Sequence, residues 1–217
     1  GYSLTRDDGT TEFIEFFDFT SLTKSKDTTN VYRAINQFEF EQYHLCRPDI
    51  VLFVNGIPLS LFELKNPGDE KPSIWDAYNQ TVGYHKDKTA DLKDYYTDIP
   101  ALMQFDFINV ISDGSNTKYG SIFSDYEFYF KWKSTNGEDY DNSDGPASIN
   151  KLIEGLFNPQ TFLNVFQNYI FIPDNSKDTV ILPKYYQYYG AEKMYSNILS
   201  LLAGLAVMGE LGHMHHS

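Results

Sequence analysis

Short apolar runs separated by turn residues dominate the first half of the chain. Two of them, Asp49–Val54 and Leu59–Lys65, flank Asn55-Gly56, a dipeptide that is typical of a tight β-hairpin. Both runs are apolar at nearly every position, so we expect helices to cover this hairpin on both faces. The alternating stretch Val31–Glu41 predicts another strand, whereas the apolar and acidic pattern of Thr11–Thr20 suits a helix or a strand equally.

A helical pattern follows the hairpin. Ser73 is a candidate N-cap for a helix over Ser73–Lys86, and Ile74, Ala77 and Tyr78 begin its packing stripe. Further helices are expected at 91–103, 150–157, 160–168 and 185–202, and further strands at 107–112, 120–123, 127–132, 169–172 and 179–182. This mixture predicts an α/β fold, a mixed β-sheet with α-helices on its faces.

The composition agrees with a folded domain. Hydrophobic residues make up 41% of the 217 residues, with 17 Tyr and 17 Phe, which is ample for a core. No run approaches the roughly eighteen uninterrupted apolar residues of a membrane helix. A single cysteine, Cys46, excludes an internal disulfide framework, and we expect it to be a buried thiol. With no visible secretory signal, a cytoplasmic protein is the simplest expectation.

The charge balance initially argues against a nucleic-acid partner. The formal net charge is −13, while affinity for phosphates comes largely from Lys and Arg. A metal-dependent nuclease must nevertheless concentrate carboxylates where it cuts, and its basic surface can be local or lie on another domain. We therefore expect the isolated chain to cut DNA poorly.

The most informative pattern is Arg47-Pro48-Asp49, followed by the hairpin and then by Glu63-Leu64-Lys65. Glu63 and Lys65 are two positions apart on one strand and share a face. A strict two-residue turn would set Asp49 opposite Phe62 and put Glu63 on the other face. One extra residue in the loop would set Asp49 directly opposite Glu63, with Cβ atoms about 5 Å apart. We expect the longer loop, because the apolar pattern permits that register.

A facing carboxylate pair with a lysine beside it suits one kind of chemistry. Two close carboxylates repel each other, and a divalent cation relieves that cost. Few, hard oxygen ligands favour Mg²⁺, which activates a water and stabilises charge on a scissile phosphate. Gln80 and Tyr84 are four apart on one helix face and can support this site. The simpler interpretation is that these are solvated charges at the ends of strands.

Three segments resemble the N-terminal nuclease of type I restriction enzyme motor (R) subunits. They are Asn36-Gln37, Arg47–Pro67 and the stretch from Gln80 to Tyr84. That family belongs to the PD-(D/E)xK nucleases and carries a Q-x-x-x-Y motif. The resemblance implies a restriction-endonuclease-like mixed sheet flanked by helices. It also implies roles for five residues: Asp49 and Glu63 as Mg²⁺ ligands, Lys65 as the catalytic lysine, and Gln80 and Tyr84 as the accessory motif.

The resemblance extends from about Asn30 to Lys193. Around Tyr185–Lys193 it matches the stretch before a helicase motor, where a glutamine, here Gln187, can contact adenine. The G-x-x-x-x-G-K-[ST] phosphate-binding loop is absent, so ATP is expected only in the full-length protein. We expect a nuclease domain over 1–183, the helical start of a motor region over 184–210 and an expression-tag remnant over 211–217. Glu12 and Glu15 are candidates for the acidic residue that the family tends to carry on an early helix.

The partners implied by this resemblance are double-stranded DNA and the methyltransferase and specificity subunits of a restriction complex. The main alternative is a non-cleaving DNA-binding or docking module of the same fold, which the acidic charge balance favours. A glycosidase that uses Asp49 and Glu63 as its acid/base pair is a poorer alternative, because Lys65 has no role in it.

Overall fold

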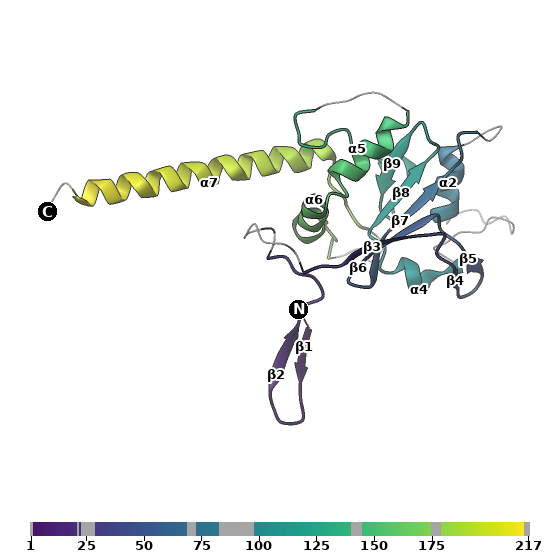
Figure 1. Ribbon diagram of the computed structural model, residues 1–217, viewed down its shortest axis with the longest axis horizontal. Helices are drawn as coiled ribbons and strands as arrows, with labels where there is room; N and C mark the ends of the chain where they lie inside the picture. The colour runs from purple at the N-terminus through teal and green to yellow at the C-terminus, as the bar shows by residue number, and fades with distance from the viewer. Residues whose placement is uncertain are drawn as a thin grey trace.

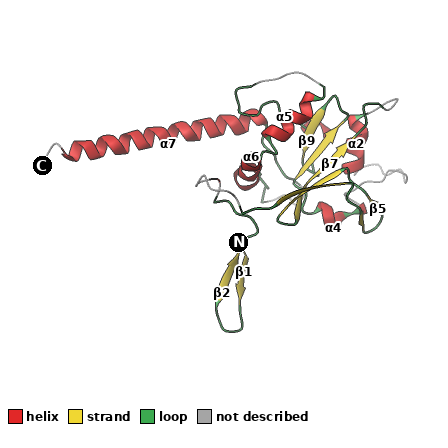
Figure 2. Cartoon of the chain, in the orientation of Figure 1, coloured by secondary structure: helices red, strands yellow, loops and turns green. Residues whose placement is uncertain are grey.

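A five-stranded mixed sheet with helices on both faces forms the centre of the molecule (Figure 1, Figure 2). In the computed structural model, the described residues are 2–20, 22, 29–68, 73–82, 98–139, 145–174 and 179–214. The strands, in order across the sheet, are β3 (Tyr32–Asn36), β6 (Ile50–Val54), β7 (Ile57–Leu64), β8 (Ile108–Ser112) and β9 (Thr117–Gly120). This architecture confirms the predicted α/β class.

The strand directions in this sheet are mixed. β6 and β7 form an antiparallel hairpin, as Asn55-Gly56 predicts, and β3 pairs antiparallel with β6. β8 returns parallel to β7, and β9 pairs antiparallel with β8. β7 is therefore the middle strand, and its residues from Leu59 to Glu63 are all buried.

Different helices cover the two faces of the sheet. On one face lie α2 (Ile74–Thr81) and α4 (Pro100–Met103), which pack against the side of β7 that carries Leu61 and Glu63. On the other face lie α5 (Ala147–Gly155), α6 (Pro159–Asn164) and the π-helical η2 (Val165–Tyr169). The hairpin is thus covered on both sides, as its continuous apolar pattern predicts.

The remaining elements are peripheral. Two short hairpins, β1 (Tyr2–Thr5) with β2 (Thr11–Ile14) and β4 (Phe40–Glu41) with β5 (Leu45–Cys46), stand apart from the main sheet. Figure 1 shows the first hairpin extending away from the sheet, as does most of the long helix α7 (Tyr185–Met214). The start of α7 packs on the core, through the buried Tyr188. Among the described residues, no helix is long and apolar enough to cross a membrane.

Two predicted strands are wrong. Residues 120–123 do not form a strand: β9 ends at Gly120, and a turn follows in which the Ser121 and Ser124 hydroxyls lie 2.8 Å apart. Residues 127–132 begin inside a 3-10 turn, η1 (Tyr126–Phe128), and within this stretch only Phe130 pairs, with Tyr119. Their aromatic residues reflect core packing rather than strand pairing, since Trp132 is 2% exposed.

Two more predicted strands, 169–172 and 179–182, are wrong, because Tyr169 ends η2 and only Phe171 and Ile181 pair. The remaining predicted elements that fall on described residues are present, with shifted ends. Ser73 is the N-cap of α2, because its hydroxyl accepts a hydrogen bond from the backbone N–H of Trp75 at 3.1 Å. Thr11–Ile14 resolves as a strand, and the segments around Phe171 and Ile181 meet in one isolated bridge. The continuation of α2 beyond Val82, and residues 91–97, lie outside the described residues.

Candidate active site

A β-bulge, rather than a longer loop, sets the register at the candidate site. The turn is a tight two-residue one at Asn55-Gly56, where both residues have positive φ (53° and 84°), so the predicted longer loop is wrong. The extra residue is Leu59, which is left between the pairs Leu52–Ser60 and Phe53–Pro58. Beyond the bulge Ile50 pairs with Phe62, so the next position places Asp49 opposite Glu63.

Asp49 is half-buried, and two hydrogen bonds fix its carboxylate. Oδ2 accepts the backbone N–H of Leu64 at 2.7 Å, which ties Asp49 directly to the neighbouring strand. Oδ1 accepts Nε2 of Gln37 at 2.8 Å. Both donors are neutral, and a carboxylate oxygen has two lone pairs, so these two bonds leave acceptor capacity on each oxygen.

Glu63, Lys65 and Gln80 form a connected group beside Asp49. Glu63 is only 3% exposed, and its Oε1 lies 2.9 Å from Nζ of Lys65. The same ammonium donates to Oε1 of Gln80, which reaches it from α2. A buried carboxylate needs such a charged partner, because burial without one is costly. The lysine is thereby held between the Glu63 carboxylate and the Gln80 amide of α2.

The predicted accessory residues have different outcomes. Gln80 points toward the carboxylate group and contacts Lys65, as its position on the helix predicts. Tyr84 lies outside the described residues. Glu12 is not on an early helix: it lies in β2, where Oε2 pairs with Arg6 at 2.8 Å, and Glu15 follows that strand as an exposed residue.

The donors around the site fit a magnesium ion better than an ion that needs many protein ligands. Among the described residues there is no group of three or more His, Cys, Asp or Glu side chains that could hold a metal. Asp49 and Glu63 are the carboxylates here that could serve as ligands, with water or substrate completing the shell. Mg²⁺ is commonly bound in this way, through one or two carboxylates and several waters.

Gln37 is the residue near the site to which sequence reasoning gave no role. It belongs to the Asn36-Gln37 pair, but its link to Asp49 depends on the pairing of β3 with β6. The dipeptide Asn36-Gln37 does not by itself indicate which strand β3 will pair with. Alternation along residues 31–41 indicates a strand without specifying its partner.

Gln187 lies at the start of α7, away from the residues described above. It is exposed, and its side-chain carbonyl accepts the backbone N–H of Lys184 at 2.9 Å. This bond satisfies a free donor in the first turn of the helix, as the glutamine of a capping box does. In the structure Gln187 therefore has a capping role, and its predicted contact with adenine stays a prediction.

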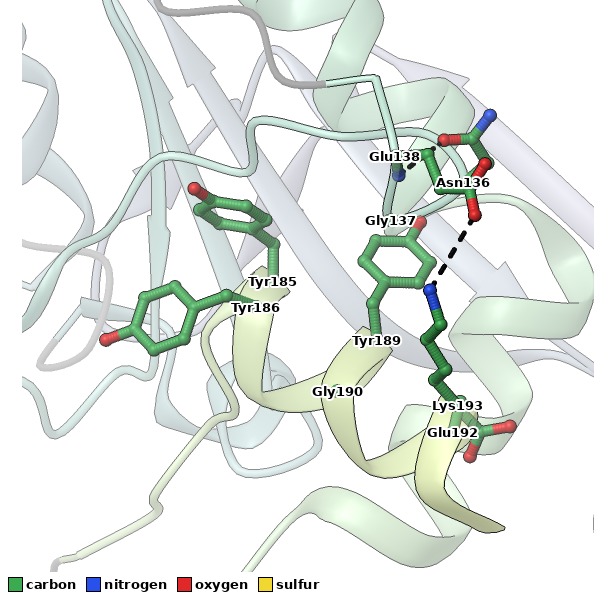
Figure 3. Close-up of a pocket in the computed structure, with 9 residues that line it drawn as sticks. All are labelled: Asn136, Gly137, Glu138, Tyr185, Tyr186, Tyr189, Gly190, Glu192 and Lys193. Atoms are coloured by element: carbon green, nitrogen blue, oxygen red, sulfur yellow. Dashed lines mark hydrogen bonds and ion pairs between the residues drawn. The ribbon is translucent and has the colours of Figure 1, made fainter. Parts of the chain in front are cut away.

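A pocket of about 350 Å³ lies beside the start of α7 (Figure 3). Tyr185, Tyr186 and Tyr189 line it from the helix, and the segment 136–138 lines it from the opposite side. An ion pair of 3.9 Å between Lys193 and Glu138 spans one end. None of the candidate site residues lines this pocket, so it is separate from the carboxylate pair.

The mixed sheet, with an acidic pair and a lysine at its middle strands, defines an α/β domain with a restriction-endonuclease-like fold. The chain belongs to the family described as type I restriction enzyme R protein N terminus, whose sequence pattern matches residues 1–128.

Several curated relatives carry matching names. The MjaIXP type I restriction endonuclease subunit of Methanocaldococcus jannaschii is 34% identical over 214 residues, which covers 89% of this chain and 18% of that protein. The HindI endonuclease subunit of Haemophilus influenzae is 30% identical, covering 76% of this chain and 15% of that protein. The EcoprrI endonuclease subunit of Escherichia coli is 28% identical, covering 89% of this chain and 56% of that protein. The chain thus spans less than a fifth of the first two relatives.

Proposed function

We propose that this chain is a Mg²⁺-dependent endonuclease domain that hydrolyses phosphodiester bonds in double-stranded DNA. The observation that carries this proposal is that Asp49 accepts a hydrogen bond from the backbone of Leu64, between Glu63 and Lys65, while Lys65 bonds to both Glu63 and Gln80. Matched spacing in a PD-(D/E)xK pattern adds to it. A buried carboxylate that is paired with a lysine at a strand end is the kind of group that chemistry at a metal site requires.

Each side chain has a distinct task in this proposal. When bound, Mg²⁺ would activate a water and stabilise charge on the phosphate. Asp49, bonded to the backbone next to Glu63, would share one cation with the Glu63 carboxylate. Lys65 places an ammonium beside them, which can orient the attacking water and offset charge that develops on the phosphate. Gln80 restrains the lysine from the helix side.

The surrounding assembly is part of the same proposal. The curated relatives are named endonuclease subunits of type I restriction enzymes, and this chain covers only part of their length. We propose that it works in an R subunit, with methyltransferase and specificity subunits, and that ATP serves the motor of the full-length protein. The nuclease domain would span 1–183, a motor region would begin at 184–210, and 211–217 would be an expression-tag remnant.

The test compares two glutamate variants in the assembled full-length enzyme. Glu63→Gln keeps the size of the side chain but removes a carboxylate ligand, so we expect loss of plasmid cleavage at every Mg²⁺ concentration. Glu154→Gln is the matched control, since Glu154 is exposed on α5, on the opposite face of the sheet. Cleavage by Glu63→Gln at the wild-type rate, or cleavage that persists after chelation of divalent ions, would contradict the proposal.

A further inference from the structure

The residue that follows strand β3 contacts Asp49 twice. Asn36 pairs with Ile50, so the next pair across the two strands is Gln37 and Asp49. The backbone N–H of Gln37 donates to the Asp49 carbonyl at 2.8 Å, and its side-chain amide donates to Oδ1 of Asp49, also at 2.8 Å. The same residue therefore holds both the main chain and the carboxylate of Asp49.

Gln37 and Leu64 restrain the Asp49 carboxylate from opposite sides. Leu64 donates its backbone N–H to Oδ2 from β7, and Gln37 donates its amide to Oδ1 from the end of β3. With one donor on each oxygen, the plane of the carboxylate cannot rotate without losing a hydrogen bond. A carboxylate that must accept a metal ion benefits from such orientation, because it need not be reorganised on binding.

The backbone at Gln37 indicates that a particular geometry is enforced there. Its φ is 50°, in the left-handed region that residues other than glycine rarely adopt. A glycine would occupy this position without strain, but it would have no amide to offer Asp49. The strained backbone brings the glutamine side chain to the carboxylate.

We infer that Gln37 is a positioning residue that orients Asp49 for metal binding. This inference rests on the proposed metal-dependent function. The choice of a glutamine is consistent with it, since a neutral amide fixes the carboxylate without adding a positive charge that would compete with the cation. An arginine or lysine in the same place would neutralise Asp49 and weaken its attraction for Mg²⁺.

The test uses two substitutions that both remove the amide but differ in whether they relieve the backbone strain. Gln37→Gly removes the amide and relieves the strain, whereas Gln37→Met removes the amide and retains the strain. Gln104→Ala is the control, because Gln104 is an exposed glutamine at the C-cap of α4 whose amide donates to the Ala101 carbonyl and not to Asp49. Asp49→Asn reports whether the metal site exists. Binding of Mn²⁺ to each purified chain is measured by calorimetry, and thermal unfolding is measured in parallel without metal.

We expect Gln37→Gly and Gln37→Met to weaken Mn²⁺ binding alike, by about 10- to 100-fold, as is typical for loss of a partner behind a metal ligand. Their melting temperatures should differ, with the glycine variant the more stable. Both variants lack the amide, but only the methionine variant keeps the backbone strain that destabilises the folded state. Gln104→Ala should bind as the wild type does, and Asp49→Asn should lose binding.

The results that would overturn the inference fall into two groups, one that leaves the metal site intact and one that removes it. If Asp49→Asn loses Mn²⁺ but both Gln37 variants bind it as tightly as the wild type, Gln37 has no positioning role and the metal site stands. The same holds if the metal affinities of the two variants differ in step with their stabilities. If the wild type binds no Mn²⁺, or Asp49→Asn binds as the wild type does, the metal site fails and the role of Gln37 fails with it.

Discussion

Two carboxylic acids are buried in neighbouring parts of the central sheet, and their surroundings differ sharply. Glu63, on β7, is 3% exposed and lies 2.9 Å from the Lys65 ammonium. Asp106, just before β8, is 6% exposed, and burial raises its pKa well above the usual range. Neither of its carboxylate oxygens has a hydrogen-bond partner within the described residues.

The difference shows that burial alone does not make an acidic residue a candidate for catalysis. Asp106 is stabilised in its protonated form, as a polar group within the fold. Glu63 has the Lys65 cation beside it, and in the proposed function it acts together with Lys65 and Asp49 on a substrate. The groups that contact a buried acid, rather than its degree of burial, distinguish a candidate catalytic acid from a core residue.

The largest expected effect is on cleavage. In the assembled full-length enzyme, Asp49→Ala and Glu63→Ala should each reduce strand cleavage by at least about 10²- to 10³-fold. Combining either with Lys65→Ala should add little, because the three residues act as a unit. Asp106→Asn should cut at the wild-type rate, since Asp106 has no role in the unit. A plasmid-nicking assay measures the cleavage rate of each variant. If the losses of Lys65→Ala and of the carboxylate variants add up in the combined variants, or if Asp106→Asn also stops cleavage, the contrast between Glu63 and Asp106 fails.

The next effect is on stability. Lys65→Met removes the cation and leaves Glu63 buried without its ion pair, so it should lower the free energy of unfolding by about 1–3 kcal/mol in the absence of metal. Adding Glu63→Gln to this variant should restore part of the loss, because the uncompensated charge is then gone. Urea denaturation of the purified chains measures both. An unchanged unfolding free energy in Lys65→Met would mean that Glu63 does not depend on Lys65.

The smallest effect concerns Asp106. Its pKa is raised in the folded state, so its contribution to stability is greatest at acid pH and is lost as the pH rises above its ordinary value of 3.8. Asp106→Asn mimics the protonated form and should therefore raise the melting temperature at neutral pH but not near pH 4. Thermal melts across that range test this. If Asp106→Asn raises the melting temperature equally at every pH, the raised pKa of Asp106 is contradicted.

Local sequence signals predicted much of the fold. Asn55-Gly56 predicted the hairpin, Ser73 predicted the start of α2, and the mixed order of elements predicted the sheet class. The bulge at Leu59 was not predictable, because β7 is apolar at nearly every position and no alternation shows which residue is extra. The aromatic residues around Trp132 suggested a strand, while tertiary packing placed them in irregular backbone.

The candidate site was predictable where its residues are close in sequence. Glu63 and Lys65 share a face by simple alternation, and Gln80 follows on the next helix. The contact of Gln37 with Asp49 was not predictable, because it depends on how β3 pairs with β6. Long-range pairing of this kind is where reasoning from a single sequence has least information.

The most direct test of the central claim is a paired measurement on Lys65→Ala in the full-length restriction complex, recording strand cleavage and ATP turnover on the same preparation. Lys65 lies beside the carboxylate pair, and the phosphate-binding loop of a motor is absent from this chain. We therefore expect cleavage to be lost while ATP turnover is unchanged. A Lys65→Ala complex that still cuts DNA at the wild-type rate would contradict the assignment of this site as the nuclease centre.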